Sequence, residues 1–155
     1  MRPLDDFSTP TATSVRIVRV FDAPAVLVWR AHTEPELVQQ WMTGPEGHTL
    51  PVCEIDFRVG GKARYVWSNP DFDMGMTAEF KEIVEHERIV YTEDYDAWPE
   101  GATTVTATFE GSATTTTMTV DIENLSREAR DLAMQPGFEE GFASSYTKLD
   151  DIVQT

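Results

Sequence analysis

The sequence contains a single cysteine, Cys53, and no long run of apolar residues. One cysteine excludes an intramolecular disulfide, and a chain without about 20 consecutive apolar residues has no candidate transmembrane helix. No basic segment followed by an apolar segment opens the chain, as it would in a secretory leader. We therefore expect a cytoplasmic protein that does not insert in a membrane and does not depend on disulfides.

Basic residues are scarce as well: 12 Lys and Arg stand against 27 Asp and Glu, for a formal net charge of -15 at pH 7. Proteins bind nucleic acids and anionic lipid surfaces through Lys and Arg, so this balance argues against both partners. Between residues 71 and 100, ten acids accompany only Lys81 and Arg88. We interpret this segment as a solvated outer face; a surface for a basic partner is the alternative.

Residues that carry catalysis or bind metals are few and dispersed. By strand alternation Cys53 faces inward, whereas His48 and Glu54 face the other way, so no local Cys–His dyad can form. No paired Cys or His spacing typical of a metal site occurs, and Asp71-Phe72-Asp73 lacks the rest of a calcium loop. We expect no cofactor, no metal and no catalytic nucleophile, with Cys53 behaving as a small hydrophobe.

The 155 residues suit one globular domain. Residues 1–12 show no period and are predicted to form a flexible arm, and residues 13–155 a single domain. After a strand over 13–22, two short helices are predicted. Asp22 is expected to cap the first, which carries a proline in its first turn, and the second ends near Trp41.

Alternating apolar and polar residues predict six further strands, with a bulge near Glu82. Gly60 and Gly61 predict a three-residue hairpin loop at 59–61 between the first two of them. The register that keeps apolar side chains on one face pairs Ile55 with Tyr65, Cys53 with Trp67, and Asp56 with Arg64 as an outer ion pair.

The C-terminal segment has the apolar spacing of a helix. Ser126 is expected to cap a short helix over 127–134, and Pro136-Gly137 separates it from a longer one. That helix, over about 137–153, is roughly 25 Å long, close to the length of an eight-residue strand. We expect it to pack on the apolar face of the sheet. Its apolar stripe consists of Phe138, Phe142, Tyr146, Leu149 and Val153.

Several strings occur in the order typical of one family. They are Arg19-Val-Phe-Asp-Ala-Pro24 with Val28-Trp29, Glu34-Pro-Glu-Leu37, Trp41, Gly44-Pro45, Asp56-Phe-Arg-Val-Gly-Gly61, Glu82-Ile83, Glu87-Arg-Ile-Val90, Gly137-Phe-Glu-Glu-Gly141 and Leu149-Asp150. Over about residues 13–153 the chain resembles bacterial proteins related to the activator of the 90-kDa heat-shock protein ATPase, in the SRPBCC or START-like superfamily. Met42 stands where many relatives carry a second tryptophan, which puts a pocket contact there in doubt.

The resemblance implies an α+β helix-grip fold. In this fold a curved antiparallel sheet wraps around a long C-terminal helix, with two short helices between the first two strands. It also implies a cavity between helix and sheet, which the superfamily uses for lipids, hormones and polyketides. Some relatives are cyclases or aromatases, and the eukaryotic namesake is a co-chaperone.

Inward-facing aromatic residues are the candidate binding site, since aromatic rings supply apolar area and tyrosine hydroxyls supply directional contacts. The same residues would suit a filled core. Glu93 falls on the inward face, where it either anchors a ligand, with Arg19 as a companion, or lies at a solvated rim. The predicted ligand-binding residues are Trp41, Tyr65, Trp67, Met76, Phe80, Tyr91, Glu93, Tyr95, Trp98, Phe138, Phe142 and Tyr146.

Binding of a small lipophilic or aromatic molecule is thus the function we expect. The alternatives are an enzyme of cyclase, aromatase or hydrolase type acting on an apolar substrate, and a co-chaperone-like stress-response protein. A second copy of the chain and a heat-shock protein are the further partner hypotheses.

Overall fold

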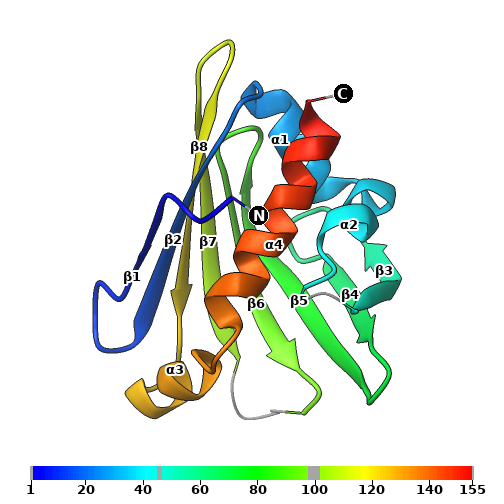
Figure 1. Ribbon diagram of the computed structural model, residues 1–155, viewed down its shortest axis with the longest axis vertical. Helices are drawn as coiled ribbons and strands as arrows, with labels where there is room; N and C mark the ends of the chain where they lie inside the picture. The colour runs from blue at the N-terminus through cyan, green and yellow to red at the C-terminus, as the bar shows by residue number, and fades with distance from the viewer. Residues whose placement is uncertain (1, 45–46, 98–101, 155) are drawn as a thin grey trace.

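The computed structural model describes residues 2–44, 47–97 and 102–154, which form eight strands and four helices in an α+β arrangement (Figure 1). The strands make one curved antiparallel sheet in the order β1-β2-β8-β7-β6-β5-β4-β3. Their bounds are β1 Asp6–Ser8, β2 Ser14–Phe21, β3 Thr49–Ile55, β4 Lys62–Ser68, β5 Asp73–Val84, β6 Arg88–Tyr95, β7 Thr103–Gly111 and β8 Thr116–Glu123. The helices are α1 Ala25–Thr33, α2 Pro35–Trp41, α3 Arg127–Ala133 and α4 Phe138–Val153.

Helix α4 lies across the concave face of the sheet, and α1 and α2 cover one end of that face (Figure 1). Tyr146 of α4 contacts Phe21 of β2 and Trp41 of α2, with ring centroids 5.9 and 5.8 Å apart. Leu149 and Val153, further along the same stripe, are buried. A single apolar stripe on the helix and one apolar face of the sheet are thereby buried against each other, as the helix-grip prediction required.

Side-chain alternation along the strands follows the predicted pattern. Inward residues of β5, β7 and β8 are buried, and the ladder between β5 and β6 shifts between Phe80 and Glu82, where the sequence predicts a bulge. Ser126 caps α3 as predicted, since its hydroxyl accepts a hydrogen bond from the Ala129 backbone N–H at 3.0 Å. None of the helices in the described ranges is long and apolar enough to span a membrane.

The predicted register of the β3–β4 hairpin is wrong by two residues. Cys53 pairs with Tyr65 and Ile55 with Ala63. The chain reverses one residue earlier than expected because Arg58 to Gly61 form a hydrogen-bonded turn, with the Gly61 N–H 2.8 Å from the Arg58 carbonyl. A shift of two residues keeps every side chain on its predicted face, since that face repeats every second residue.

The same shift removes the predicted ion pair between Asp56 and Arg64. Arg64 pairs with Asp96 at 2.5 Å, and Asp56 pairs with Arg58 at 2.9 Å. Both pairs lie on the outer surface and involve exposed or half-buried groups.

Two predictions at the N-terminal end also differ from the structure. The segment expected to be a loose arm contributes β1, in which Phe7 pairs with Ile17 of β2 and contacts the Phe138 ring at 6.1 Å. A three-residue strand is too short to show a period of its own. The cap position of α1 is held by Pro24, not Asp22, and no side chain caps this helix.

Candidate functional site

Glu93 brings a carboxyl group to the concave face of the sheet. Alternation along β6 places it on the same side as Ile89, which is buried in the core. In the ladder it lies between Ala78 of β5 and Thr103 of β7. Burial raises the pKa of Glu93 from its ordinary value of 4.5 to about 7, and the nearby Thr103 hydroxyl opposes this rise in part.

The four tyrosines of the chain all lie near this carboxyl. The charge of Glu93 acts on each of them and raises its pKa above the ordinary value of 10. For Tyr95 that charge is the largest cause of the raised pKa; for the other three, burial is the largest. Their hydroxyls therefore stay protonated at neutral pH and can donate hydrogen bonds. They are Tyr65 on β4, Tyr91 and Tyr95 on β6, and Tyr146 on α4.

One buried polar group beside Glu93 has no hydrogen-bond partner within the described parts of the chain. Thr103 lies beside Glu93, but its buried Oγ1 forms no hydrogen bond of ordinary geometry among those residues. Because buried polar groups normally have partners, this hydroxyl is available to a bound molecule.

Aromatic rings border the carboxyl on both layers. On the sheet, Trp67 stacks between Tyr65 and Tyr95, with centroid distances of 5.8 and 6.5 Å. On α4, Phe142 lies 5.1 Å from Phe138 and 5.9 Å from Tyr146. The site therefore has apolar walls with a few polar groups, the usual composition of a small-molecule site.

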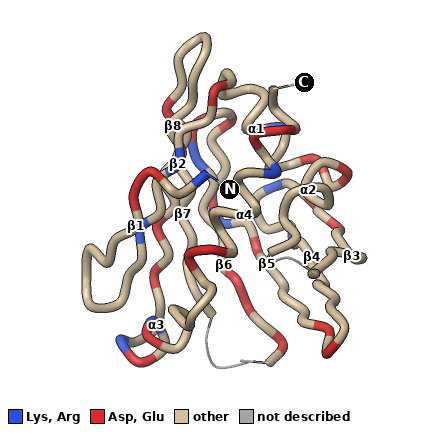
Figure 2. The backbone as a smooth tube through the Cα atoms, viewed as in Figure 1, with Lys and Arg blue, Asp and Glu red and all other residues tan. Residues whose placement is uncertain are grey.

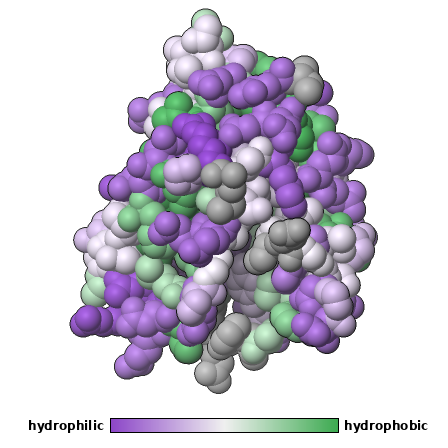
Figure 3. Space-filling view, in the orientation of Figure 1, coloured by the Kyte–Doolittle hydropathy of each residue, from purple (hydrophilic) through white to green (hydrophobic). Residues whose placement is uncertain are grey.

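The site lies where the molecular surface is hollowed. Figure 3 shows a depression between α4 and strands β5 and β6. Tyr91, Glu93 and Tyr95 of β6 are only half-buried although they face the interior, and Phe138 and Phe142 of α4 are half-buried opposite them. The partial exposure of these five residues distinguishes them from the closed core.

Other predicted site residues lie deeper. Tyr65, Met76, Phe80 and Tyr146 are buried in the core. Trp41 and Trp67 are buried too, and their indole N–H groups donate to backbone carbonyls, of Ala31 at 2.7 Å and of Met42 at 2.9 Å. Trp98 was also predicted, but it lies outside the described residues.

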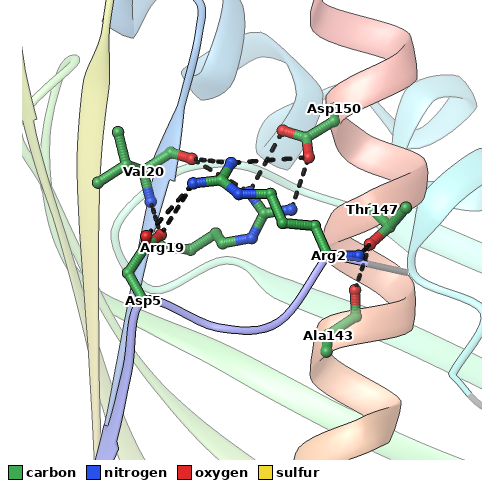
Figure 4. A network of polar contacts seen from close by, with 7 residues as sticks. All are labelled: Arg2, Asp5, Arg19, Val20, Ala143, Thr147 and Asp150. Atoms are coloured by element: carbon green, nitrogen blue, oxygen red, sulfur yellow. Dashed lines mark hydrogen bonds and ion pairs between the residues drawn. The ribbon is translucent and has the colours of Figure 1, made fainter.

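Arg19 does not accompany Glu93 as the sequence hypothesis supposed. It is fully buried on β2, where its Nη2 donates to the Asp150 carboxylate of α4 at 2.5 Å and its Nη1 to the Val20 carbonyl at 3.1 Å (Figure 4). Arg2 reaches the same cluster and donates to the Val20 carbonyl at 2.8 Å. Arg19 thus links α4 to strand β2. Because the Asp150 carboxylate already neutralises its charge, Arg19 is not available to a ligand.

Comparison with protein families finds a match over residues 22–154 to the family described as "Activator of Hsp90 ATPase homolog 1-like protein". The chain belongs to this family. Comparison with curated protein sequences found no match.

Solved structures agree with this membership in the Activator of Hsp90 ATPase homolog 1-like family. A crystal structure of a Rhodobacter sphaeroides protein has a TM-score of 0.89 at 25% identity, over 96% of this chain and 97% of the other. Protein CV1439 from Chromobacterium violaceum has a TM-score of 0.80 at 26% identity, over 94% and 99%. Protein Ms6760 from Mycobacterium smegmatis has a TM-score of 0.86 at 22% identity, over 97% of each chain. These likenesses establish the shared fold.

Two open surface depressions are weaker candidates in this family member. One of about 430 Å³ is lined by Glu54, Ile55, Asp56, Lys62, Ala63, Arg64 and Thr77, and one of about 220 Å³ by Thr77, Asp94, Tyr95 and Asp96. Their arginine is already paired with Asp96, and most of their other charged groups are exposed. Neither depression is lined by a described residue of α4.

Two further titratable groups lie in the interior. Burial lowers the pKa of His32 to about 4, so the imidazole is neutral at pH 7, and its Nδ1 lies 2.8 Å from the Val28 carbonyl. Burial and the charge of Glu36 raise the pKa of Cys53 to about 11. A neutral thiol is a poor nucleophile, so Cys53 is unsuited to covalent catalysis. The described residues contain no cluster of His, Cys, Asp and Glu that could hold a metal ion.

Sequence reasoning missed Thr103. Its signal was the inward parity that it shares with Val105, which the sequence predicts correctly. Threonines at 104, 106 and 108 share the outer face of this strand, so the pattern predicts an apolar inner face and does not single out Thr103.

Proposed function

We propose that the protein binds a small lipophilic or aromatic molecule between the sheet and α4, with Glu93 holding the polar group of that molecule. The observation that carries this proposal is a desolvated carboxyl that lies near four tyrosines and beside a Thr103 hydroxyl without a partner in the described residues. Membership in the Activator of Hsp90 ATPase homolog 1-like family and the depression at this face support it. Cytoplasmic location and a homodimer remain predictions from the sequence.

In this proposal the residues divide by role. Tyr91 and Tyr95 flank Glu93 on the sheet, and their hydroxyls fix the orientation of a polar group. Phe138 and Phe142 cover the apolar part from α4. The more deeply buried rings keep the walls in place, since interiors are close-packed and transmit changes in shape.

Catalysis is the second candidate, because a carboxyl with a pKa of about 7 suits a general acid or base at neutral pH. An enzyme acting on an apolar substrate would use Glu93 for proton transfer. A co-chaperone role is suggested by the family description alone and would require contact with a heat-shock protein.

Mass spectrometry of small molecules extracted from the purified native protein tests the proposal. Extracts of the wild type and of Glu93→Gln should differ in the amount of one compound, whereas Asp94→Asn, which changes an exposed acid one residue away, should match the wild type. Incubation of the recovered compound with the protein then separates binding from turnover, because only turnover changes its mass. Extracts without any compound, together with unchanged tryptophan fluorescence across a lipophilic library, would exclude the binding function.

A further inference from the structure

The Glu93 carboxyl lacks a cationic partner in the described part of the chain. Its pKa is set by burial and by the Thr103 hydroxyl, with no contribution from Lys, Arg or His. Arg19 of β2 is a buried cation, but Asp150 neutralises it. An isolated ionised carboxylate in an apolar site is unfavourable, and a positive charge brought by a ligand would compensate it.

The neighbours of Glu93 suit a cation as well. Aromatic faces attract ammonium groups within about 6 Å of the ring centroid. Tyr91 and Tyr95 stand on either side of Glu93 along β6. Tyr146 of α4 lies near Tyr91 and Glu93, and its ring centroid is 5.9 Å from that of Phe142. A carboxylate bordered by aromatic rings offers both charge and π-face contacts to an ammonium group.

The net negative charge of the protein also favours a positively charged ligand. Asp and Glu lie along the last part of β6 and at the start of α4, the two segments that border the depression (Figure 2). With a formal net charge of -15, the protein attracts cations and repels anionic ligands such as fatty acids.

We infer that the ligand is a lipophilic cation, an amine or quaternary ammonium group on an apolar body, and that ionised Glu93 holds the charged group among the tyrosine rings. This inference rests on the proposed function and specifies its ligand class. A neutral ligand would instead accept a hydrogen bond from protonated Glu93, and the experiment below separates the two.

Benzyltrimethylammonium and neopentylbenzene form a matched pair of probes, since they have the same shape and differ only at one atom, which is a cationic nitrogen in the first and a neutral carbon in the second. Titration calorimetry or ligand-observed NMR at pH 8 should give at least a 10-fold tighter Kd for the cation. Glu93→Gln should remove this preference without weakening the binding of neopentylbenzene, and Asp94→Asn should preserve it.

The affinity for the cation should rise about 10-fold from pH 6 to pH 8. With a pKa of about 7, the ionised fraction of Glu93 grows by that factor, and only this form is competent to bind. The surrounding hydroxyls of Tyr65, Tyr91, Tyr95 and Tyr146 stay protonated in this range, and so does the thiol of Cys53 beside Tyr65. Arg19, which is paired with Asp150, acts electrostatically on Tyr146, and Thr103 does not titrate.

Equal affinities for the two probes at pH 8, or a cation affinity that does not change with pH, would overturn the inference and leave the binding function standing. Absence of binding by both probes would overturn it too, and the extraction experiment would then decide the binding function separately. The pH profile of the wild type does not depend on any variant folding correctly.

Discussion

The buried carboxyl of Glu93 should make the folded protein less stable as the pH rises. Its pKa is about 7 in the folded state and near 4.5 once exposed, so between these values the folded state binds more protons. The free energy of unfolding is therefore unaffected by Glu93 below about pH 4.5, and it falls as the pH rises from there to about 7. A pKa shift of this size corresponds to a loss of about 3 kcal/mol in the free energy of unfolding. We expect a loss of about 2 kcal/mol, because Glu93 is only half-buried.

Substitution of Glu93 by Gln removes the titration and keeps the shape of the side chain. Urea unfolding of the wild type and Glu93→Gln at pH 5 and pH 8 gives the free energy of unfolding of each. The free energy of unfolding of the variant, relative to that of the wild type, should be about 2 kcal/mol higher at pH 8 than at pH 5. Asp94→Asn is the matched control, since Asp94 is exposed on the same strand, and it should show no such gain.

Parallel pH dependences for the wild type and Glu93→Gln, within about 0.5 kcal/mol, would refute the reasoning, because this margin is near the resolution of such measurements. That result would place Glu93 in a solvated position, as the rim hypothesis supposed. The proposed anchor would then lose its physical basis.

Three more predictions concern the rest of the fold. Asp150→Asn leaves the fully buried Arg19 without its counter-charge and should lower the free energy of unfolding by about 2 to 4 kcal/mol, whereas Asp121→Asn, which breaks an exposed pair, should change it little; urea unfolding checks both. Ser126→Ala should cost about 1 kcal/mol by loss of the α3 cap, measured in the same way. A thiol reagent at pH 8 should modify Cys53 far more slowly in the folded protein than in urea, because its pKa is about 11; equal rates would contradict the burial.

Periodicity predicted the parts of this fold in which one side of an element is buried. The apolar stripe from Phe138 to Val153 placed α4, and alternation placed the inward residues of β5, β7 and β8. These patterns are strong because a residue on the wrong face would expose apolar area or bury a polar group.

The missed features depend on contacts between distant segments. The β3–β4 register follows from a turn whose glycine-rich loop also bonds to Phe80 of β5, which alternation within the hairpin cannot reveal. Strand β1 pairs with the neighbouring strand β2 through Phe7 and Ile17, and Phe7 also contacts Phe138, which lies far along the chain. Arg19 was correctly placed inward, but its partner Asp150 lies 131 residues away.

Part of the candidate site was predictable from alternation as well. Glu93 is a charged residue among the apolar residues of the inward face, and such a residue is informative because burying a charge is costly. The sequence could not decide between an interior position and a solvated rim. That depends on how α4 and its neighbours enclose β6, and the raised pKa of Glu93 reflects this enclosure.

The stability cost of Glu93 and its proposed role as an anchor are linked. At pH 8 the ionised carboxylate costs about 2 kcal/mol, which Gln would avoid while filling the same space. A ligand that binds only the folded protein stabilises it by RT ln(1 + [L]/Kd), so a cation at about 30 times its Kd would offset this cost. Addition of benzyltrimethylammonium to the ligand-free protein should therefore raise its free energy of unfolding more at pH 8 than at pH 6. The ionised carboxylate destabilises the fold when it is alone and stabilises the complex with the cation.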